Sequence, residues 1–174
     1  MSLRNIITRD NPNIRTKAKR VPVVDDSVRR LMDDMVETMI AAPGVGLAAT
    51  QIDVHLRVFV MKIDNSIYHL ANPEVIKSRG EVTHDEGCLS VPGWIGETRR
   101  CQWVHIKGVN RSGKEIRLKG DGLLAQCIQH EMDHLDGMLY LDRLSDMDTL
   151  REIRRDETEE VTAEDEPPVT SGSH

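Results

Sequence analysis

Residues 121–137 constrain the fold of this chain most, because they combine helical periodicity with two closely spaced histidines. Two adjacent apolar stripes at helical spacing consist of Leu123, Cys127, His130 and His134, and of Leu124, Ile128, Glu131 and Leu135. Histidines four residues apart share one helix face and can bind one divalent metal ion, while the adjacent carboxylate can take a proton from water on that metal. We therefore predict a core helix with a metal site. The polar residues expected to face away from the core are Gln126, Gln129, Asp133 and Asp136.

A third metal ligand is needed, because a hydrolytic metal ion usually has three protein ligands and one open position. Downstream, Asp142, Asp146, Asp148 and the acidic tail are not in a setting that indicates a preformed ligand. Upstream, Cys88 is the better candidate. Taken alone, such a cysteine is more often a small buried apolar residue, but a thiolate binds Fe(II), Zn(II), Ni(II) or Co(II) strongly.

Length and charge limit the classes of function. A chain of 174 residues is most simply one domain, which we place at residues 1–150. The net charge of −6 argues against binding to DNA or to a membrane surface by bulk electrostatics. Three cysteines and no apolar leader predict a reducing, cytoplasmic setting without a membrane span. Residues 156–174 are acidic, include Pro167 and Pro168, and are expected to be disordered.

The remaining elements follow from periodicity and turn residues. A Met-rich stripe over residues 28–40, capped by Asp25 or Asp26, predicts a helix whose apolar face packs in the core. Alternating or continuous apolar runs predict strands. The other predicted elements are a solvated arm at 1–24, a hairpin of 56–63 with 67–71, two short strands flanking residues 79–80, a hairpin of 103–106 with 114–119, a turn or short strand at 138–144 and a helix at 147–155.

Residues 44–51 (GVGLAATQ) combine two glycines with small side chains and one amide. The segment is not a phosphate loop, because no lysine follows the glycines. It is either a tight packing site or a strand that lines a substrate. Together with residues 86–90 (EGCLS) and 129–134 (QHEMDH), it resembles the peptide deformylases in order and separation. The resemblance covers residues 6–144 and implies an α+β fold in which antiparallel sheets surround a central metal-binding helix.

The resemblance also implies an activity, the removal of the formyl group from N-terminal formylmethionine of new polypeptides, with release of formate. By that resemblance, Cys88, His130 and His134 hold one divalent metal ion, Fe(II) in preference to Zn(II), Ni(II) or Co(II). Glu131 takes the proton as metal-bound water attacks and returns it to the leaving amine. The Gln51 side-chain amide and the Leu89 backbone N–H stabilise the oxyanion. The residues expected to contact substrate are Gly44, Val45, Gly46 and Cys127, with the His130 ring completing the methionine pocket.

The sequence departs from the family pattern at several positions. His84 replaces an apolar side chain two residues before Glu86, which predicts a more polar pocket rim. Ile95 stands where bacterial members have an arginine, and Arg99 or Arg100 is a candidate to replace its contact with the substrate backbone. The C-terminal helix that docks some bacterial members on the ribosome is short here. Because RNA would repel the acidic tail that follows, the sequence gives only weak support for transient ribosome contact.

Two other functions fit part of the sequence. A general H-E-x-x-H peptidase or another amide hydrolase would use a downstream ligand and would not depend on Cys88. A metal-binding or ribosome-associated module without catalysis would keep the fold and lose turnover. Gln51, Leu89 and Glu131 argue against the second alternative, since a structural site would be closed by a fourth protein ligand.

Overall fold

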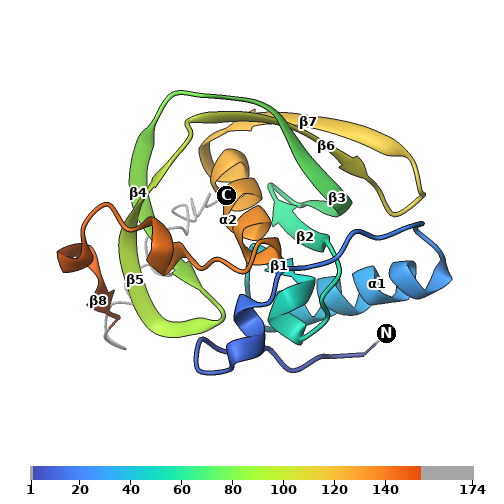
Figure 1. Cartoon of the computed structure of the whole chain (residues 1–174), viewed down its shortest axis with the longest axis horizontal. Coiled ribbons are helices and arrows are strands. Elements are labelled where there is room, and N and C mark those ends of the chain that lie inside the picture. Colours follow the sequence, from blue (N-terminus) through green and yellow to red (C-terminus); the bar gives the residue numbers. More distant parts are fainter. Residues whose placement is uncertain (1, 154–174) are drawn as a thin grey trace, which may run out of the picture.

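The computed structural model of the protein describes residues 2–153. One helix, α2 (Gly122–Leu135), lies at the centre, and two antiparallel sheets wrap around it (Figure 1). The five-stranded sheet has the order β1 (Gly46–Ala48), β2 (Val58–Ile63), β3 (Ser66–Arg79), β6 (Trp103–Val109) and β7 (Glu115–Asp121). The three-stranded sheet has the order β4 (Val82–Cys88), β5 (Val91–Arg100) and β8 (Arg151–Glu152). The predicted α+β fold, with antiparallel sheets around the helix that carries His130 and His134, is confirmed.

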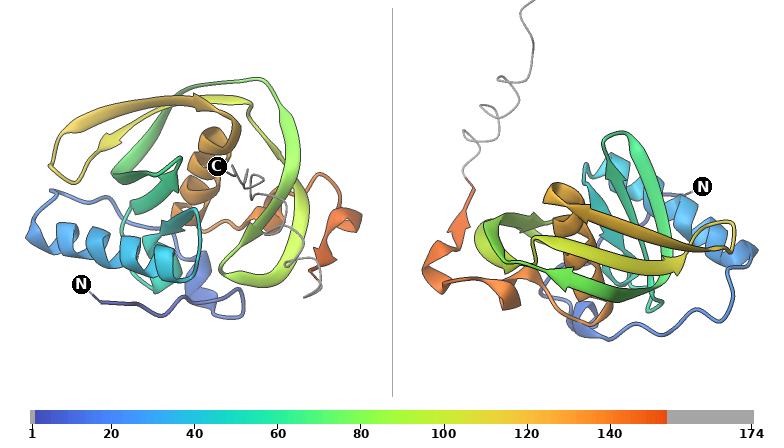
Figure 2. Two further views of the ribbon diagram at one scale, coloured as in Figure 1. Left: turned by 180° about the vertical axis from the view of Figure 1, so that it is seen from behind. Right: turned by 90° about the horizontal axis from the view of Figure 1, so that it is seen from above.

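The strand β2 is apolar on both faces because a helix covers each of them. Val58 and Val60 pack in the core cluster built on α1 (Asp26–Ala41), whereas Phe59 and Met61 pack in the cluster built on α2. Figures 1 and 2 show α1 and α2 on either side of this part of the sheet. This burial explains why residues 56–63 are apolar on both faces apart from Arg57 and Lys62, which a strand exposed on one face would not need.

Local signals at α1 and at the first hairpin act as the sequence predicts. Asp25 is the N-cap of α1, and its carboxylate accepts a hydrogen bond from the Val28 N–H at 3.0 Å. Asp64 and Asn65 connect β2 to β3 with φ angles of 49° and 66°, the left-handed pair that a two-residue hairpin turn requires. Ile40, at the end of the apolar stripe of α1, is exposed rather than buried.

Two predicted segments differ from the structure, and one observed strand was not predicted. The N-terminal arm is not merely solvated, because it buries Ile14 and Val21 completely or nearly so and pairs its backbone with the core. Residues 147–153 form no α-helix: a 3₁₀ turn (Met147–Thr149) leads into β8, which pairs with Trp94 and Ile95 of β5. Tertiary pairing there outweighs local helix propensity. The strand β5 itself was not predicted.

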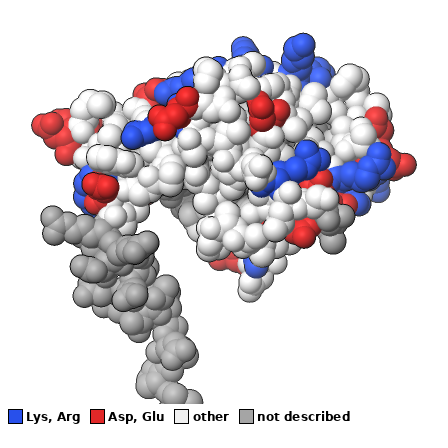
Figure 3. All heavy atoms as spheres, turned by 90° about the horizontal axis from the view of Figure 1, so that it is seen from below, with Lys and Arg blue, Asp and Glu red and all other residues white. Residues whose placement is uncertain are grey.

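Charged side chains are interspersed on the surface. On the face drawn in Figure 3, acidic and basic groups surround a broad area without charged side chains. Among residues 2–153, no helix has the length and apolar composition needed to cross a membrane. The predicted acidic tail at 156–174 lies outside the described residues.

Candidate active site

Cys88, His130 and His134 come together although β4 and α2 are far apart in sequence. The Cys88 Sγ lies 3.3 Å from His134 Nε2, which lies 3.2 Å from His130 Nε2. The ligand atoms of the three residues all lie within 4.8 Å of one another. Among the described residues this is the one group of three or more metal-binding side chains with such a geometry. The structure thus brings together the three residues that the sequence analysis selected as metal ligands.

The hydrogen bonding around this group fits a bound metal ion. His130 Nδ1 lies 2.7 Å from a Glu86 carboxylate oxygen and donates to it, which leaves Nε2 as the atom with a lone pair. His134 Nδ1 is buried without a hydrogen-bond partner. Burial holds the pKa of His134 well below its usual range. A neutral imidazole, an oriented imidazole and a thiol therefore face one point, as the donor set of a divalent transition metal does.

Glu131 lies on the next position of α2 and is 3% exposed. One of its carboxylate oxygens is buried and has no hydrogen-bond partner. Burial raises the pKa of this carboxyl to about 7, because the charged form lacks solvation. A carboxyl group with a pKa near neutrality and a free oxygen in a cavity can both accept and donate a proton.

The Gln51 amide is held in one orientation. Its Oε1 accepts a hydrogen bond from the Ala48 N–H at 2.9 Å, while its Nε2 donates to Ser90 Oγ at 3.1 Å and lies 3.6 Å from Cys88 Sγ. Leu89 lies between Cys88 and Ser90 and lines the same cavity as Glu131. The two predicted oxyanion donors therefore flank the group of metal-binding side chains.

A cavity of about 910 Å³ opens beside these residues. Gly44, Val45, Gly46 and Cys127, which the sequence analysis assigned to substrate contacts, all line it. Val45 is exposed, whereas Cys127 is buried. Burial and the nearby charge of Glu131 raise the pKa of the Cys127 thiol well above its usual range, so Cys127 presents an uncharged wall to the cavity.

Gly46 is required by a close approach from α2. A Cβ atom at this position would lie 2.6 Å from Glu131 Oε1 and 2.8 Å from Cys127 Sγ. The glycine therefore makes room for the carboxylate of Glu131. Because β1 lies at one edge of the five-stranded sheet, its backbone also offers an edge to an extended peptide.

An ionic cluster under the site was not predicted from the sequence. Glu86 is 4% exposed, accepts hydrogen bonds from Arg100 at 2.8 and 2.9 Å, and also accepts from Thr98 and His130. Burial opposes its charge, but the hydrogen bonds from Arg100 and His130 outweigh this and hold its pKa well below the usual range. Alternation along β4 places Glu86 on the same strand face as Cys88, which was a usable signal.

Two expectations for α2 are corrected. Asp133, predicted to face away from the core, is buried. Its carboxylate forms an ion pair with Arg100 of β5, and the guanidinium charge balances that of the carboxylate. Leu123, predicted to lie in the core, is 49% exposed and lines the cavity. Both errors have one cause. The strands that pack against α2 decide which of its faces are buried, and the helical pattern of α2 alone does not predict where those strands lie.

The departures from the family pattern also have definite places. His84 Nε2 lies 3.3 Å from the Glu86 carboxylate, so His84 faces the ionic cluster and is absent from the cavity lining. Arg100 is committed to Glu86 and Asp133 and is 5% exposed. Arg99 pairs with Glu81 and lines a different cavity. Neither Arg99 nor Arg100 lines the candidate active-site cavity, so neither is placed to make the expected contact with the substrate backbone.

Known proteins match both the sequence and the fold. The polypeptide deformylase family model matches residues 3–150. A peptide deformylase of Dehalococcoides mccartyi is 46% identical over 159 residues, which cover 90% of this chain and 95% of that protein. A peptide deformylase of Thermomicrobium roseum is 45% identical over 172 residues, covering 94% and 98% of the two chains.

Solved structures give the same result. The chain is similar to the crystal structure of a peptide deformylase from Legionella pneumophila, with a TM-score of 0.81 and 40% identity, covering 95% of this chain and all of that one (100%). It is also similar to a peptide deformylase from Ehrlichia chaffeensis in complex with actinonin, with a TM-score of 0.82 and 35% identity over 96% of this chain and 100% of that one. The chain therefore belongs to the polypeptide deformylase family and is an enzyme of that family.

Proposed function

We propose that the protein removes the formyl group from N-terminal formylmethionine of newly made polypeptides and releases formate. The observation that carries this proposal is the convergence of Cys88, His130 and His134 beside the buried carboxylate of Glu131. Family membership supports the substrate class. The catalytic domain in this proposal is residues 1–150.

Cys88 Sγ, His130 Nε2 and His134 Nε2 would hold one divalent metal ion. A Cys-His-His donor set suits Zn(II), but the similarity to bacterial deformylases makes Fe(II) our first choice. When bound, such an ion polarises the formyl carbonyl and lowers the pKa of water. Enzymes of this family are metal-dependent.

Glu131 would move the proton. As a carboxylate it accepts a proton from the water that adds to the formyl carbon, and as the acid it returns that proton to the amine nitrogen when the C–N bond breaks. The products are formate and the free amine. The unpartnered buried oxygen of Glu131, whose residue lines the cavity, supports this role.

Gln51 Nε2 and the Leu89 N–H would donate hydrogen bonds to the oxyanion that forms on the formyl carbon. The bond from the Ala48 N–H to Gln51 Oε1 fixes which end of the amide faces the site, so the donating Nε2 lies toward Cys88. We propose that the methionine side chain occupies the part of the cavity near Val45, Cys127 and the His130 ring, with Gly44 and Gly46 beside the substrate backbone.

The test is formate release from a formyl-Met tripeptide by anaerobically purified protein loaded with Fe(II). The acetyl-Met tripeptide and a Glu131→Ala variant serve as controls. We expect release from the formyl peptide alone and loss of release in the variant. Absence of formate from fully loaded protein would rule out this function.

A further inference from the structure

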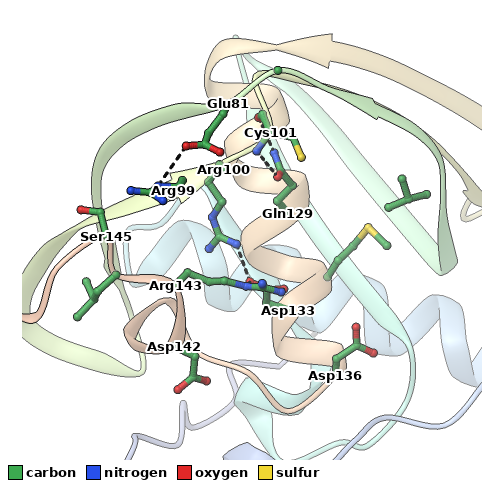
Figure 4. Close-up of a pocket in the computed structure, with 14 residues that line it drawn as sticks. Glu81, Arg99, Arg100, Cys101, Gln129, Asp133, Asp136, Asp142, Arg143 and Ser145 are labelled. Atoms are coloured by element: carbon green, nitrogen blue, oxygen red, sulfur yellow. Dashed lines mark hydrogen bonds and ion pairs between the residues drawn. The ribbon is translucent and has the colours of Figure 1, made fainter.

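A second cavity, of about 610 Å³, is lined by residues of α2 that do not line the candidate active site, Gln129, Met132, Asp133 and Asp136 (Figure 4). Its lining includes Asp133, Arg143 and Arg99, three charged side chains that the proposed reaction does not use. Figure 4 shows Arg143 reaching from the segment after α2 to Asp133, while Arg99 is paired with Glu81. The two arginines therefore share a cavity but have different partners.

From Arg143 a continuous chain of hydrogen bonds runs through the protein to His130. Arg143 donates to both carboxylate oxygens of Asp133 at 3.1 and 3.2 Å. The Asp133 carboxylate accepts from Arg100 at 2.5 Å, and Arg100 donates to both oxygens of Glu86 at 2.8 and 2.9 Å. Glu86 then accepts from His130 Nδ1 at 2.7 Å.

The chain of hydrogen bonds has one exposed end, at Arg143. The side chains of Arg100 and Glu86 are each 3% exposed and that of Asp133 is 12% exposed, whereas that of Arg143 is 44% exposed. Without Arg143, Asp133 would keep Arg100 as its charged partner but would lose the group that holds its carboxylate in place. Bidentate arginine–carboxylate pairs fix orientation as well as charge, so Arg143 orients the carboxylate to which Arg100 also donates.

We infer that Arg143 is a positioning residue for the metal ligand His130, acting through Asp133, Arg100 and Glu86. The inference rests on the proposed metal site. Groups that hydrogen-bond to metal-binding histidines set the tautomer and the ring orientation, and their loss typically lowers metal affinity about 10- to 100-fold. Glu86 accepts that hydrogen bond from His130 directly. Arg143 is the exposed member of the hydrogen-bond chain, so it can be substituted without leaving a cavity in the core.

Release of Co(II) tests the inference without measuring turnover. Full-length protein loaded with Co(II) is mixed with excess chelator, and the cobalt–thiolate absorbance is followed with time. We expect Glu86→Gln to accelerate release about 10- to 100-fold. We expect Arg143→Gln to accelerate release by up to about tenfold, because three residues stand between Arg143 and His130. Arg143→Lys should behave like Arg143→Gln, since lysine lacks the planar fork that holds both oxygens of Asp133.

Arg99→Gln is the matched control, because it removes a cation from the same cavity and Arg99 makes none of the hydrogen bonds between Arg143 and His130. It should release Co(II) at the rate of the unchanged protein. The inference is overturned if Arg143→Gln and Arg143→Lys both release Co(II) at the unchanged rate, or if Arg99→Gln accelerates release as much as they do. Melting of the metal-free variants, followed by circular dichroism, identifies any variant that fails to fold; Arg143→Lys, which keeps the charge, then decides.

Formate release distinguishes this inference from the proposed function. If the unchanged protein binds Co(II) but releases no formate, the proposed deformylase activity is wrong, while the effect of Arg143 on Co(II) release still tests the positioning role. If formate is released and Arg143 has no effect on metal release, the activity stands and the positioning role is wrong.

Discussion

Single residues at this site are constrained by what surrounds them. Gly46 is an example, since a Cβ at this position would meet the Glu131 carboxylate and the Cys127 thiol below 3.0 Å. We expect Gly46→Ala to displace Glu131 and to lower kcat/KM for a formyl-Met peptide by about two powers of ten, the loss typical of a displacement of about 1 Å.

The control for that substitution is Gly108→Ala. A Cβ at Gly108 would lie 3.0 Å from Leu70 and 3.1 Å from the Ala71 carbonyl oxygen, which crowds the sheet away from the site. It should lower the melting temperature while leaving kcat/KM close to that of the unchanged protein. Equal losses of activity in both variants would show that Gly46 matters for packing alone.

His69 predicts a pH effect at the residue scale. Burial, with a smaller contribution from the charge of Arg111, lowers the pKa of His69, whereas Asp33 opposes the shift. The unfolded chain therefore binds a proton at His69 more readily than the folded protein, so stability is lost as pH falls below the ordinary histidine pKa of about 6.5. His69→Gln should show a smaller decrease in melting temperature between about pH 7.5 and about pH 5.5. An unchanged decrease would contradict this origin.

Elements depend on turns and on pairing between distant strands. The β2–β3 hairpin needs a left-handed conformation at Asn65, where φ is 66°. A β-branched residue there costs about 1–2 kcal/mol, whereas glycine costs none of that strain. In urea unfolding, Asn65→Val should lower the free energy of unfolding by about this amount, and Asn65→Gly should not. A tolerated valine would mean that another turn type is accessible.

The elements that the sequence predicted are those with local signals. The spacing of His130 and His134, the cap at Asp25 and the turn at Asp64 are each encoded within a few residues, and each is present in the structure. Strand β8 could not be predicted in this way, because it exists by pairing with β5, more than fifty residues earlier along the chain. The burial of Asp133 likewise depends on Arg100 from β5.

At the scale of the whole molecule, the candidate metal site joins the two sheets through α2. Cys88 ends β4, while both histidines belong to the central helix, so an ion bound by all three would restrain β4 and α2 together. A metal that binds only the folded protein adds about 2.7 kcal/mol of stability at a free concentration 100 times its dissociation constant. We expect Co(II) to raise the melting temperature and Cys88→Ala to abolish most of the increase. A full increase in Cys88→Ala would favour a downstream ligand.

The most direct measurement is formate release during titration of metal-free protein with Fe(II) under anaerobic conditions, with Cys88→Ala titrated in parallel. Release from a formyl-Met tripeptide should rise in proportion to added Fe(II), level off at one ion per chain, and stay at background in the variant. Release that does not depend on added metal, or that is equal in Cys88→Ala, would contradict deformylation at the centre formed by Cys88, His130 and His134.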